Sequence, residues 1–293
     1  MRFANILHEG EPTWAVVDGD ELVVPGALAL GCRSVSKLAA RGVETAVAWG
    51  QRVLDDSRSV RVPVGDARLL APIPRPPKNV MCLGLNYAAH AQESAAAKGD
   101  DFQAPEAPVV FTKATSSVVG PHDDITLDPR ITEQLDWEVE LAVVIGEGGA
   151  HIPEQKALDH VFGYTVVNDV SARDRQFRHK QFYLGKSMNG ACPMGPWLVT
   201  RDAVADPHDL VMECSVNGET KQKGSTGDLI FKIPYIVHVL STVHPLEPGD
   251  VIATGTPDGV GFARKPPEFL AAGDEVVCTV DGIGSIRNRI VGV

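Results

Sequence analysis

The most constraining feature of this sequence is an apolar run between positions 136 and 145 that two glutamates interrupt. The β-branched residues at the end of this run are typical of a buried strand. Side chains alternate across a strand, so Glu138 and Glu140 share one face while Trp137, Val139 and Leu141 occupy the other. Two neighbouring carboxylates beside a hydrophobic strand repel each other and lose solvation unless a positive charge lies between them.

A hard divalent cation with oxygen ligands is the simplest partner for such a pair. Asp169 ends a second predicted strand that begins at Gly163, and a carboxylate presented there would add a third oxygen ligand. We therefore predict a metal site formed by Glu138, Glu140 and Asp169. The alternative is an edge strand with two solvated glutamates, because exposed glutamate is common.

The overall composition indicates a globular protein that acts on small molecules. The chain has 293 residues, of which 44% are hydrophobic and 22% charged. A net charge of -11, without a clustered basic stripe, disfavours nucleic acid and anionic membranes as partners. We find no signal-peptide pattern at the N-terminus and no apolar run near the roughly 18 residues of a membrane span, and we expect a cytoplasmic protein.

The cysteines support the same location. The sequence contains five, an odd number, scattered without a C-x-x-C pair. This arrangement disfavours both a disulfide framework and a zinc site, and it fits a reducing compartment such as the cytosol.

A proline-rich segment divides the chain. Four prolines lie between Pro72 and Pro77, and proline neither continues a helix nor fits a central strand. We therefore predict a small N-terminal α/β domain at residues 1–72 and a catalytic domain at residues 73–293.

A short alanine-rich helix is predicted after Asn86, its candidate N-cap, and Gly99 closes it. His90 and Glu93 stand three residues apart, so they share a helix face. A carboxylate placed there would fix the histidine tautomer and raise its basicity, as in a general base. The alternative is a solvated surface pair. The polar, proline-containing residues 99–108 are typical of a mobile loop.

Three cationic residues are further candidates. Lys113 ends a predicted strand, where it is either exposed or in contact with a substrate carboxylate. Arg173 lies in a charge-rich turn, where pairing with Asp169 or Asp174 at the surface is the simpler interpretation. Lys186 lies among glycines and prolines whose backbone permits close approach of a ligand.

A glycine-rich loop follows a predicted strand near the C-terminus. The three glycines between Gly255 and Gly261 allow a tight loop that offers backbone N–H groups and the Thr256 hydroxyl to an anion. A plain glycine turn is the alternative.

Six motifs in this order resemble the fumarylacetoacetate hydrolase family over nearly all of residues 78–293. They are G-x-N-Y-x-x-H-x-x-E at Gly84–Glu93, D-W-E-x-E-L at Asp136–Leu141, N-D-V-S-A-R-D-x-Q at Asn168–Gln176, G-K-S at Gly185–Ser187, C-P-M-G-P at Cys192–Pro196 and G-T-P-x-G-V-G at Gly255–Gly261. Two positions depart from the family pattern: Asn189 stands where relatives often carry Asp, and Leu85 where a subset carries Arg. These departures put the substrate's identity in doubt more than metal binding.

The resemblance implies a mixed β-rich α+β fold, a fumarylacetoacetase-type β-roll of mixed sheets, with a small leading domain. It also implies a homodimer with one Mg²⁺ or Mn²⁺ per subunit at Glu138, Glu140 and Asp169. The substrate would be a small 2-oxo or 2,4-dioxo acid. The candidate substrate-binding residues are Asn86, Tyr87, Lys113, Arg173, Gln176 and Thr256.

Our hypothesis from the sequence is hydrolysis of a C–C bond in an acylpyruvate-like 2,4-dioxo acid. The metal would stabilise an enolate formed beside the keto group, while His90, oriented by Glu93, activates a water. Lys186 and Gln176 would orient the substrate and offset oxyanion charge. Decarboxylation of an oxaloacetate-like acid and keto–enol isomerisation need the same enolate without the water. A non-catalytic protein that binds metal and ligand is the alternative of another class.

Overall fold

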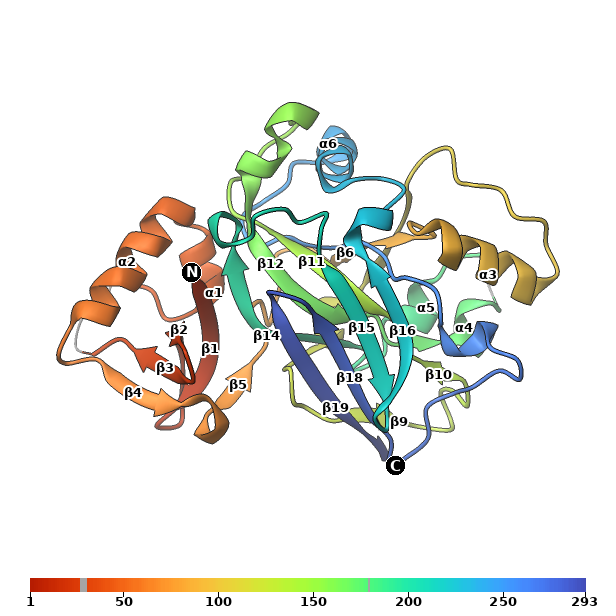
Figure 1. The fold of residues 1–293 in the computed structure, drawn as a ribbon, viewed down its shortest axis with the longest axis horizontal. Helices are drawn as coiled ribbons and strands as arrows, with labels where there is room; N and C mark the ends of the chain where they lie inside the picture. The colour runs from red at the N-terminus through yellow and green to blue at the C-terminus, as the bar shows by residue number, and fades with distance from the viewer. Residues whose placement is uncertain (27–30, 179) are drawn as a thin grey trace.

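The described residues form one large mixed sheet, a smaller five-stranded sheet and a two-stranded sheet, with few helices (Figure 1). The structure is a computed structural model that describes residues 1–26, 31–178 and 180–293. This architecture confirms the predicted sheet-rich α+β class. Among the helices that the structure describes, none has both the length and the hydropathy needed to cross a membrane.

The large sheet has twelve strands, ten of them in the order β4-β3-β2-β1-β14-β12-β11-β17-β6-β7, with β5 beside β1 and β8 beside β14. Its strands are β1 (Arg2–His8), β2 (Glu11–Asp18), β3 (Glu21–Val24), β4 (Val60–Pro63), β5 (Arg68–Leu70), β6 (Val80–Gly84), β7 (Val109–Lys113), β8 (Val118–Val119), β11 (Val139–Ile145), β12 (Val161–Asn168), β14 (Cys192–Thr200) and β17 (Val251–Ala253).

The second sheet has five strands in the order β16-β15-β18-β19-β9, and a third sheet pairs β10 with β13. These strands are β9 (Ile125–Leu127), β10 (Leu135–Asp136), β13 (Ser171–Ala172), β15 (Val211–Val216), β16 (Glu219–Ser225), β18 (Glu275–Val280) and β19 (Gly284–Gly292). The α-helices are α1 (Val35–Ala39), α2 (Val43–Asp55), α3 (Ala88–Lys98), α4 (Arg173–Gln176), α5 (Tyr183–Lys186) and α6 (Ile233–Val243).

The N-terminal strands share the large sheet with the rest of the chain. Strand β1 pairs antiparallel with β14, so that Arg2 lies opposite Val199. Phe3 and Trp14 from this segment also pack in one hydrophobic cluster with Phe162 of β12. The segment is therefore joined to the later strands by backbone hydrogen bonds and a common core, and the domain boundary near residue 72 stays a prediction.

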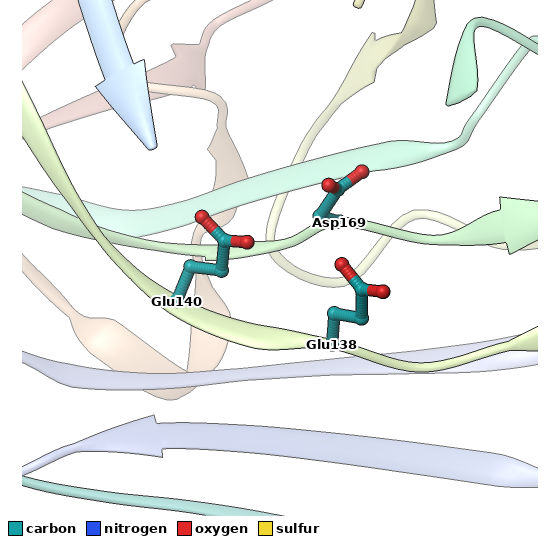
Figure 2. A group of neighbouring side chains, drawn as sticks. All are labelled: Glu138, Glu140 and Asp169. Carbon is teal, nitrogen blue, oxygen red and sulfur yellow. The ribbon is translucent and has the colours of Figure 1, made fainter. Parts of the chain in front are cut away.

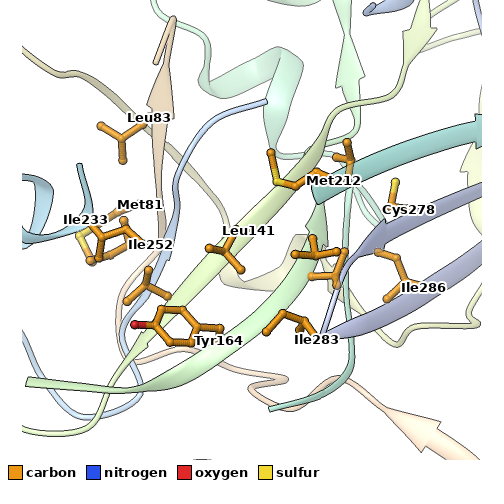
Figure 3. Close-up of a cluster of buried hydrophobic side chains, with 14 of the residues drawn as sticks. Met81, Leu83, Leu141, Tyr164, Met212, Ile233, Ile252, Cys278, Ile283 and Ile286 are labelled. Atoms are coloured by element: carbon orange, nitrogen blue, oxygen red, sulfur yellow. The ribbon is translucent and has the colours of Figure 1, made fainter. Parts of the chain in front are cut away.

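Strand β11 lies at the centre of the fold, and all seven of its residues are buried. It pairs antiparallel with β12 on one side and with β17 on the other. Figure 2 shows Glu140 rising from this strand on the same side as Glu138. The opposite face carries Val139 and Leu141 into the main hydrophobic core, shared with Cys278 and Ile286 of the five-stranded sheet (Figure 3). The predicted alternation of the apolar run is confirmed.

Helix α3 lies at the far side of the molecule from α1 and α2 (Figure 1). It ends at Gly99, whose φ of 77° is left-handed as predicted. The prediction of Asn86 as its cap is wrong, because the helix begins one residue later, with Tyr87 at the N-cap and no side-chain capping bond. The Asn86 amide instead donates to the Thr254 carbonyl at 2.8 Å and accepts from the Phe231 N–H at 2.8 Å.

We expect Leu141→Ala to lower the free energy of unfolding by about 2–5 kcal/mol, because a fully buried leucine leaves a cavity between two sheets. Val243→Ala, at an 80% exposed position on α6, is the control and is expected to change it by less than about 0.5 kcal/mol. Urea denaturation of both variants measures the difference, and equal effects would contradict this description of the core.

Candidate metal centre and active site

Three carboxylates meet at one end of the β11–β12 pair. Val139 lies opposite Asn168 in the ladder, so Glu138 and Asp169 are neighbours just beyond it, and the Asp169 N–H donates to the Glu138 carbonyl at 2.8 Å. Glu140 stands two residues along from Glu138 on the same face (Figure 2). One oxygen from each of the three carboxylates lies within 4.8 Å of the other two.

The cluster is buried. Glu138 is 4% exposed, Glu140 1% and Asp169 0%. The alternative of two solvated glutamates at an edge strand is therefore wrong. Buried carboxylates require partners, because removing a charge from water is costly without compensation.

Cations already satisfy two of the three carboxylates. The Lys186 ammonium bridges Glu138 at 2.7 Å and Asp169 at 2.8 Å. The Lys113 ammonium contacts the other oxygen of Asp169 at 2.5 Å. The Arg173 guanidinium lies 2.7 Å from Glu138. Burial opposes ionisation of Glu138, but Lys186 and Arg173 outweigh it and hold the pKa of that carboxyl well below its usual range.

Glu140 is the exception. Among the described residues, no basic side chain lies within ion-pair distance of it, and its one hydrogen bond comes from the Gly255 N–H at 2.8 Å. Burial, together with the charges of Asp169 and Glu138, raises the pKa of Glu140 well above its usual range. The cluster thus lacks a positive charge on the Glu140 side. Three converging carboxylates with this deficit fit a divalent metal ion that takes oxygen ligands.

Arg173 lines the cavity and also forms buried ion pairs within the protein. Its Nε donates to Asp136 at 2.8 Å and its Nη1 to the Gln176 side chain at 2.8 Å. Only 2% of the residue is exposed. The predicted surface pairing with Asp169 or Asp174 is therefore wrong, because the guanidinium turns inward to Asp136 and Glu138 instead.

The glycine-rich loop donates its N–H groups to carboxylates of the protein itself. Gly255 donates to Glu140 at 2.8 Å, Gly259 to Glu93 at 2.9 Å and Gly261 to Asp136 at 2.7 Å. These three N–H groups are therefore engaged before any substrate arrives. Gly259 has a φ of 100°, and a Cβ there would lie 2.2 Å from a backbone oxygen, so only glycine fits.

His90 and Glu93 form the predicted pair on α3. The His90 Nδ1 lies 2.9 Å from a Glu93 carboxylate oxygen, and the residue is 7% exposed. Because Glu93 also accepts from Gly259, the same carboxylate orients the imidazole and fastens α3 to the glycine-rich loop. The solvated-pair alternative is wrong. His90 lines the cavity, so its other imidazole nitrogen is a candidate for proton transfer to or from a ligand bound there.

A cavity opens beside the carboxylate cluster and α3. The predicted site residues on its wall are His90, Glu138, Glu140, Arg173, Gln176, Lys186 and Thr256. Aromatic and aliphatic side chains form the rest of the wall, namely Leu83, Leu85, Phe111, Phe177, Phe182 and Phe262. A mostly apolar cavity with a few converging polar groups is the usual form of a small-molecule site.

Three predicted substrate-binding residues do not line the cavity. Asn86 holds together the loops around Phe231 and Thr254. Tyr87 is 2% exposed and packs in the main core, where its hydroxyl lies 4.0 Å from the sulfur of Met212. Lys113 is fully buried behind the cluster on Asp169, so it is neither exposed nor on the cavity wall.

Sequence reasoning missed several residues of the site. Asp136 receives N–H groups from the glycine-rich loop and pairs with Arg173, and its place two residues before Glu138 was the available signal. Gln222 donates to the Thr256 hydroxyl at 2.8 Å and carries no signal in the sequence. Ser94 and Lys98 line the cavity from α3, four and eight residues after His90, a spacing that places all three on one helix face.

The two departures from the family pattern lie in different places. Leu85 is on the cavity wall, and its φ of 55° is unusual for a residue other than glycine. Asn189 is exposed and does not line the cavity. Leu85 is therefore the departure that bears directly on the ligand.

A sheet-rich fold with a buried acidic cluster beside an apolar cavity is the arrangement expected of an enzyme that binds a divalent ion and acts on small molecules. Residues 79–291 match the family model described as fumarylacetoacetate (FAA) hydrolase C-terminal. The chain therefore belongs to the fumarylacetoacetate hydrolase family, as the motifs predict.

The chain is similar to the following curated or solved proteins. It is 45% identical to oxaloacetate tautomerase YisK of Bacillus subtilis (strain 168) over 267 aligned residues. The alignment covers 91% of this chain and 87% of the relative. A fumarylacetoacetate hydrolase from psychrophilic Exiguobacterium antarcticum superposes with a TM-score of 0.84 at 39% identity, over all of both chains. Maleylpyruvate hydrolase from Sphingobium sp. SYK-6, solved with manganese(II) and pyruvate, gives a TM-score of 0.79 at 29% identity, over 100% of this chain and 99% of that one.

We expect Glu140→Gln to abolish stabilisation by a divalent metal without destabilising the metal-free protein. Glu140 is the buried carboxylate without a cationic partner, so its neutral amide removes an uncompensated charge. At 100 times the dissociation constant, a bound ion stabilises the folded wild type by about 2.7 kcal/mol. Urea denaturation in EDTA and in Mn²⁺ measures both effects. The exposed Glu133→Gln is the control, and a Mn²⁺-dependent gain retained in Glu140→Gln would contradict the predicted ligand set.

Proposed function

We propose that this protein is a divalent-metal-dependent keto–enol tautomerase of oxaloacetate or a similar 2-oxo acid. The observation that carries the proposal is the buried acidic cluster opening onto a cavity whose wall includes His90. Tautomerisation needs only a site that polarises the keto acid and a group that moves one proton. The similarity to an oxaloacetate tautomerase over 91% of this chain supports this choice among the reactions open to the family.

Glu138, Glu140 and Asp169 would hold the ion, Mg²⁺ or Mn²⁺. When bound, such an ion supplies Lewis-acid polarisation of the 2-oxo group, which favours the enolate. Lys186 contributes a fixed positive charge beside it. Burial disfavours its ammonium, but Asp169 and Glu138 outweigh that effect and raise its pKa. Lys186 therefore stays charged and offsets negative charge on the substrate oxygen rather than moving protons.

His90 moves the proton in this proposal. In the enol-to-keto direction, the enol O–H loses its proton, the C2=O bond forms, and the electron pair of the C2=C3 bond takes up a proton at C3. The Glu93 carboxylate holds His90 Nδ1 at 2.9 Å, which leaves the other nitrogen to exchange protons with the substrate. Gln176 and Thr256 on the cavity wall are placed to orient the carboxylate end of the acid.

Helix α3 would exclude bulk water while the enolate exists. Its Glu93 accepts from the Gly259 N–H, so the helix is fastened over the cavity by the same residue that orients His90. Exclusion of water strengthens the electrostatic interactions within the site and protects the intermediate.

Hydrolysis of a 2,4-dioxo acid is the second candidate. The pair of buried His90 and half-buried Glu93 has the form of a general base that activates water, and a maleylpyruvate hydrolase shares this fold. The substrate's acyl carbon would take the hydroxide, and pyruvate would leave as its enolate. Decarboxylation of oxaloacetate uses the same enolate and needs no attacking water.

We expect the purified protein to accelerate the decay of enol-oxaloacetate absorbance, and EDTA to remove that acceleration. His90→Gln is expected to lower kcat by about 10²–10⁴, because it removes the proton-moving group. His122→Gln, at an exposed histidine that does not line the cavity, is the control for loss of an imidazole.

Parallel assays of acylpyruvates and of oxaloacetate decarboxylation separate the two enzymatic candidates. Faster turnover of an acylpyruvate than of enol-oxaloacetate would favour the hydrolase, whereas no turnover of any of these acids would favour a binding protein.

The expected cytoplasmic location and homodimeric state stay predictions. Light scattering on the purified protein measures the oligomeric state.

A further inference from the structure

Helix α3 directs three polar side chains into the cavity. His90, Ser94 and Lys98 are spaced four residues apart, which places them on one face of the helix, and all three line the cavity. A rise of about 1.5 Å per residue places the backbones of His90 and Lys98 about 12 Å apart along the helix axis. The lysine side chain leans toward the helix N-terminus, so its ammonium lies closer to His90 than that backbone separation. The cavity therefore has a polar row that runs from the imidazole to its mouth.

Lys98 stands at the mouth end of this row. The residue as a whole is exposed, but its ammonium lies 4.7 Å above the ring of Phe177. Phe177 packs edge-on against Phe262 at 5.0 Å, and Phe262 lies under the Arg173 guanidinium at 4.5 Å. Two aromatic rings thus connect Lys98 to the carboxylate cluster along one wall.

Unlike the other cations of the cavity, Lys98 forms no ion pair with any carboxylate of the described residues. Arg173 is engaged by Asp136 and Glu138, and Lys186 by Glu138 and Asp169. Within the described residues, no acidic side chain lies within ion-pair distance of the Lys98 ammonium. Burial and the positive charge of Arg173 lower the pKa of Lys98, and the nearby Asp100 carboxylate offsets this only in part.

We propose that Lys98 binds the distal carboxylate of a dicarboxylic 2-oxo acid whose keto-acid end is held at Glu138, Glu140 and Asp169. This assignment rests on the proposed function and narrows its substrate class. A monocarboxylic 2-oxo acid would leave the Lys98 ammonium and the Ser94 hydroxyl without a ligand. A charge-assisted contact with a second carboxylate is stronger than a neutral one and supplies discrimination between the two kinds of acid.

The competing explanation is structural. Lys98 is the last residue of α3, and a lysine in the last turn of a helix interacts favourably with the helix dipole. That role predicts a small loss of stability on substitution and no change in ligand preference. Ligand preference is therefore the quantity that separates the two explanations.

The test compares two non-reacting 2-hydroxy acids, malate and lactate, which share a metal-chelating end and differ in the second carboxylate. Calorimetry on the Mn²⁺-loaded protein gives the affinity for each. We expect Lys98→Gln to weaken malate binding at least about tenfold and lactate binding less than about twofold. Lys98→Arg is expected to retain most of the malate affinity. Lys156→Gln removes the same charge from an exposed site outside the cavity and serves as the control.

Two further results complete the test. Equal effects of Lys98→Gln on malate and lactate, or no effect on either, would overturn the assignment and leave the proposed function standing. Malate binding that depends on Lys98 in a protein without turnover of any 2-oxo acid would support the assignment and refute the proposed function. With active protein, Lys98→Gln is expected to raise KM for oxaloacetate more than it lowers kcat.

Discussion

The site depends on one charge deficit in the middle of the protein. Four buried carboxylates face three buried cations there, which leaves one negative charge without a cationic partner among the residues that the structure describes. The carboxylates belong to Asp136, Glu138, Glu140 and Asp169, and the cations to Lys113, Arg173 and Lys186. The deficit falls on Glu140, which within the described part of the chain accepts a single hydrogen bond, from the Gly255 N–H. A buried negative charge without a cationic partner destabilises the fold. Its position on the cavity wall therefore indicates a site that binds a cation.

The same carboxylates organise the surrounding loops. The glycine-rich loop donates N–H groups to Glu140, Glu93 and Asp136. It therefore connects the acidic cluster, the His90–Glu93 pair on α3 and the arginine that pairs with Asp136 on the cavity wall. This arrangement couples the position of the loop to three separate parts of the site. A rigid scaffold of this kind holds catalytic groups in place before the substrate arrives, which is the main requirement for electrostatic stabilisation of an enolate.

Local patterns in the sequence predicted the part of the site that depends on strand alternation. The two-residue spacing of Glu138 and Glu140 and the strand-end position of Asp169 led to the cluster, and a three-residue spacing led to the His90–Glu93 pair. The partners of these groups were not predictable, because they come from distant segments. Lys113 approaches Asp169 from a strand 56 residues away in sequence, and the loop donors lie more than 100 residues from Glu140 and Asp136. Asn86, Tyr87 and Lys113 were predicted to contact the substrate, but they do not line the cavity and instead support the residues around it.

A crystal structure of the protein grown with Mn²⁺, with anomalous diffraction recorded at the manganese edge, tests the central claim most directly. We predict one anomalous peak per chain, coordinated by one oxygen each from Glu138, Glu140 and Asp169. A peak located elsewhere, or an ion-free cluster in which Lys186 still bridges Glu138 and Asp169 at saturating Mn²⁺, would contradict the account.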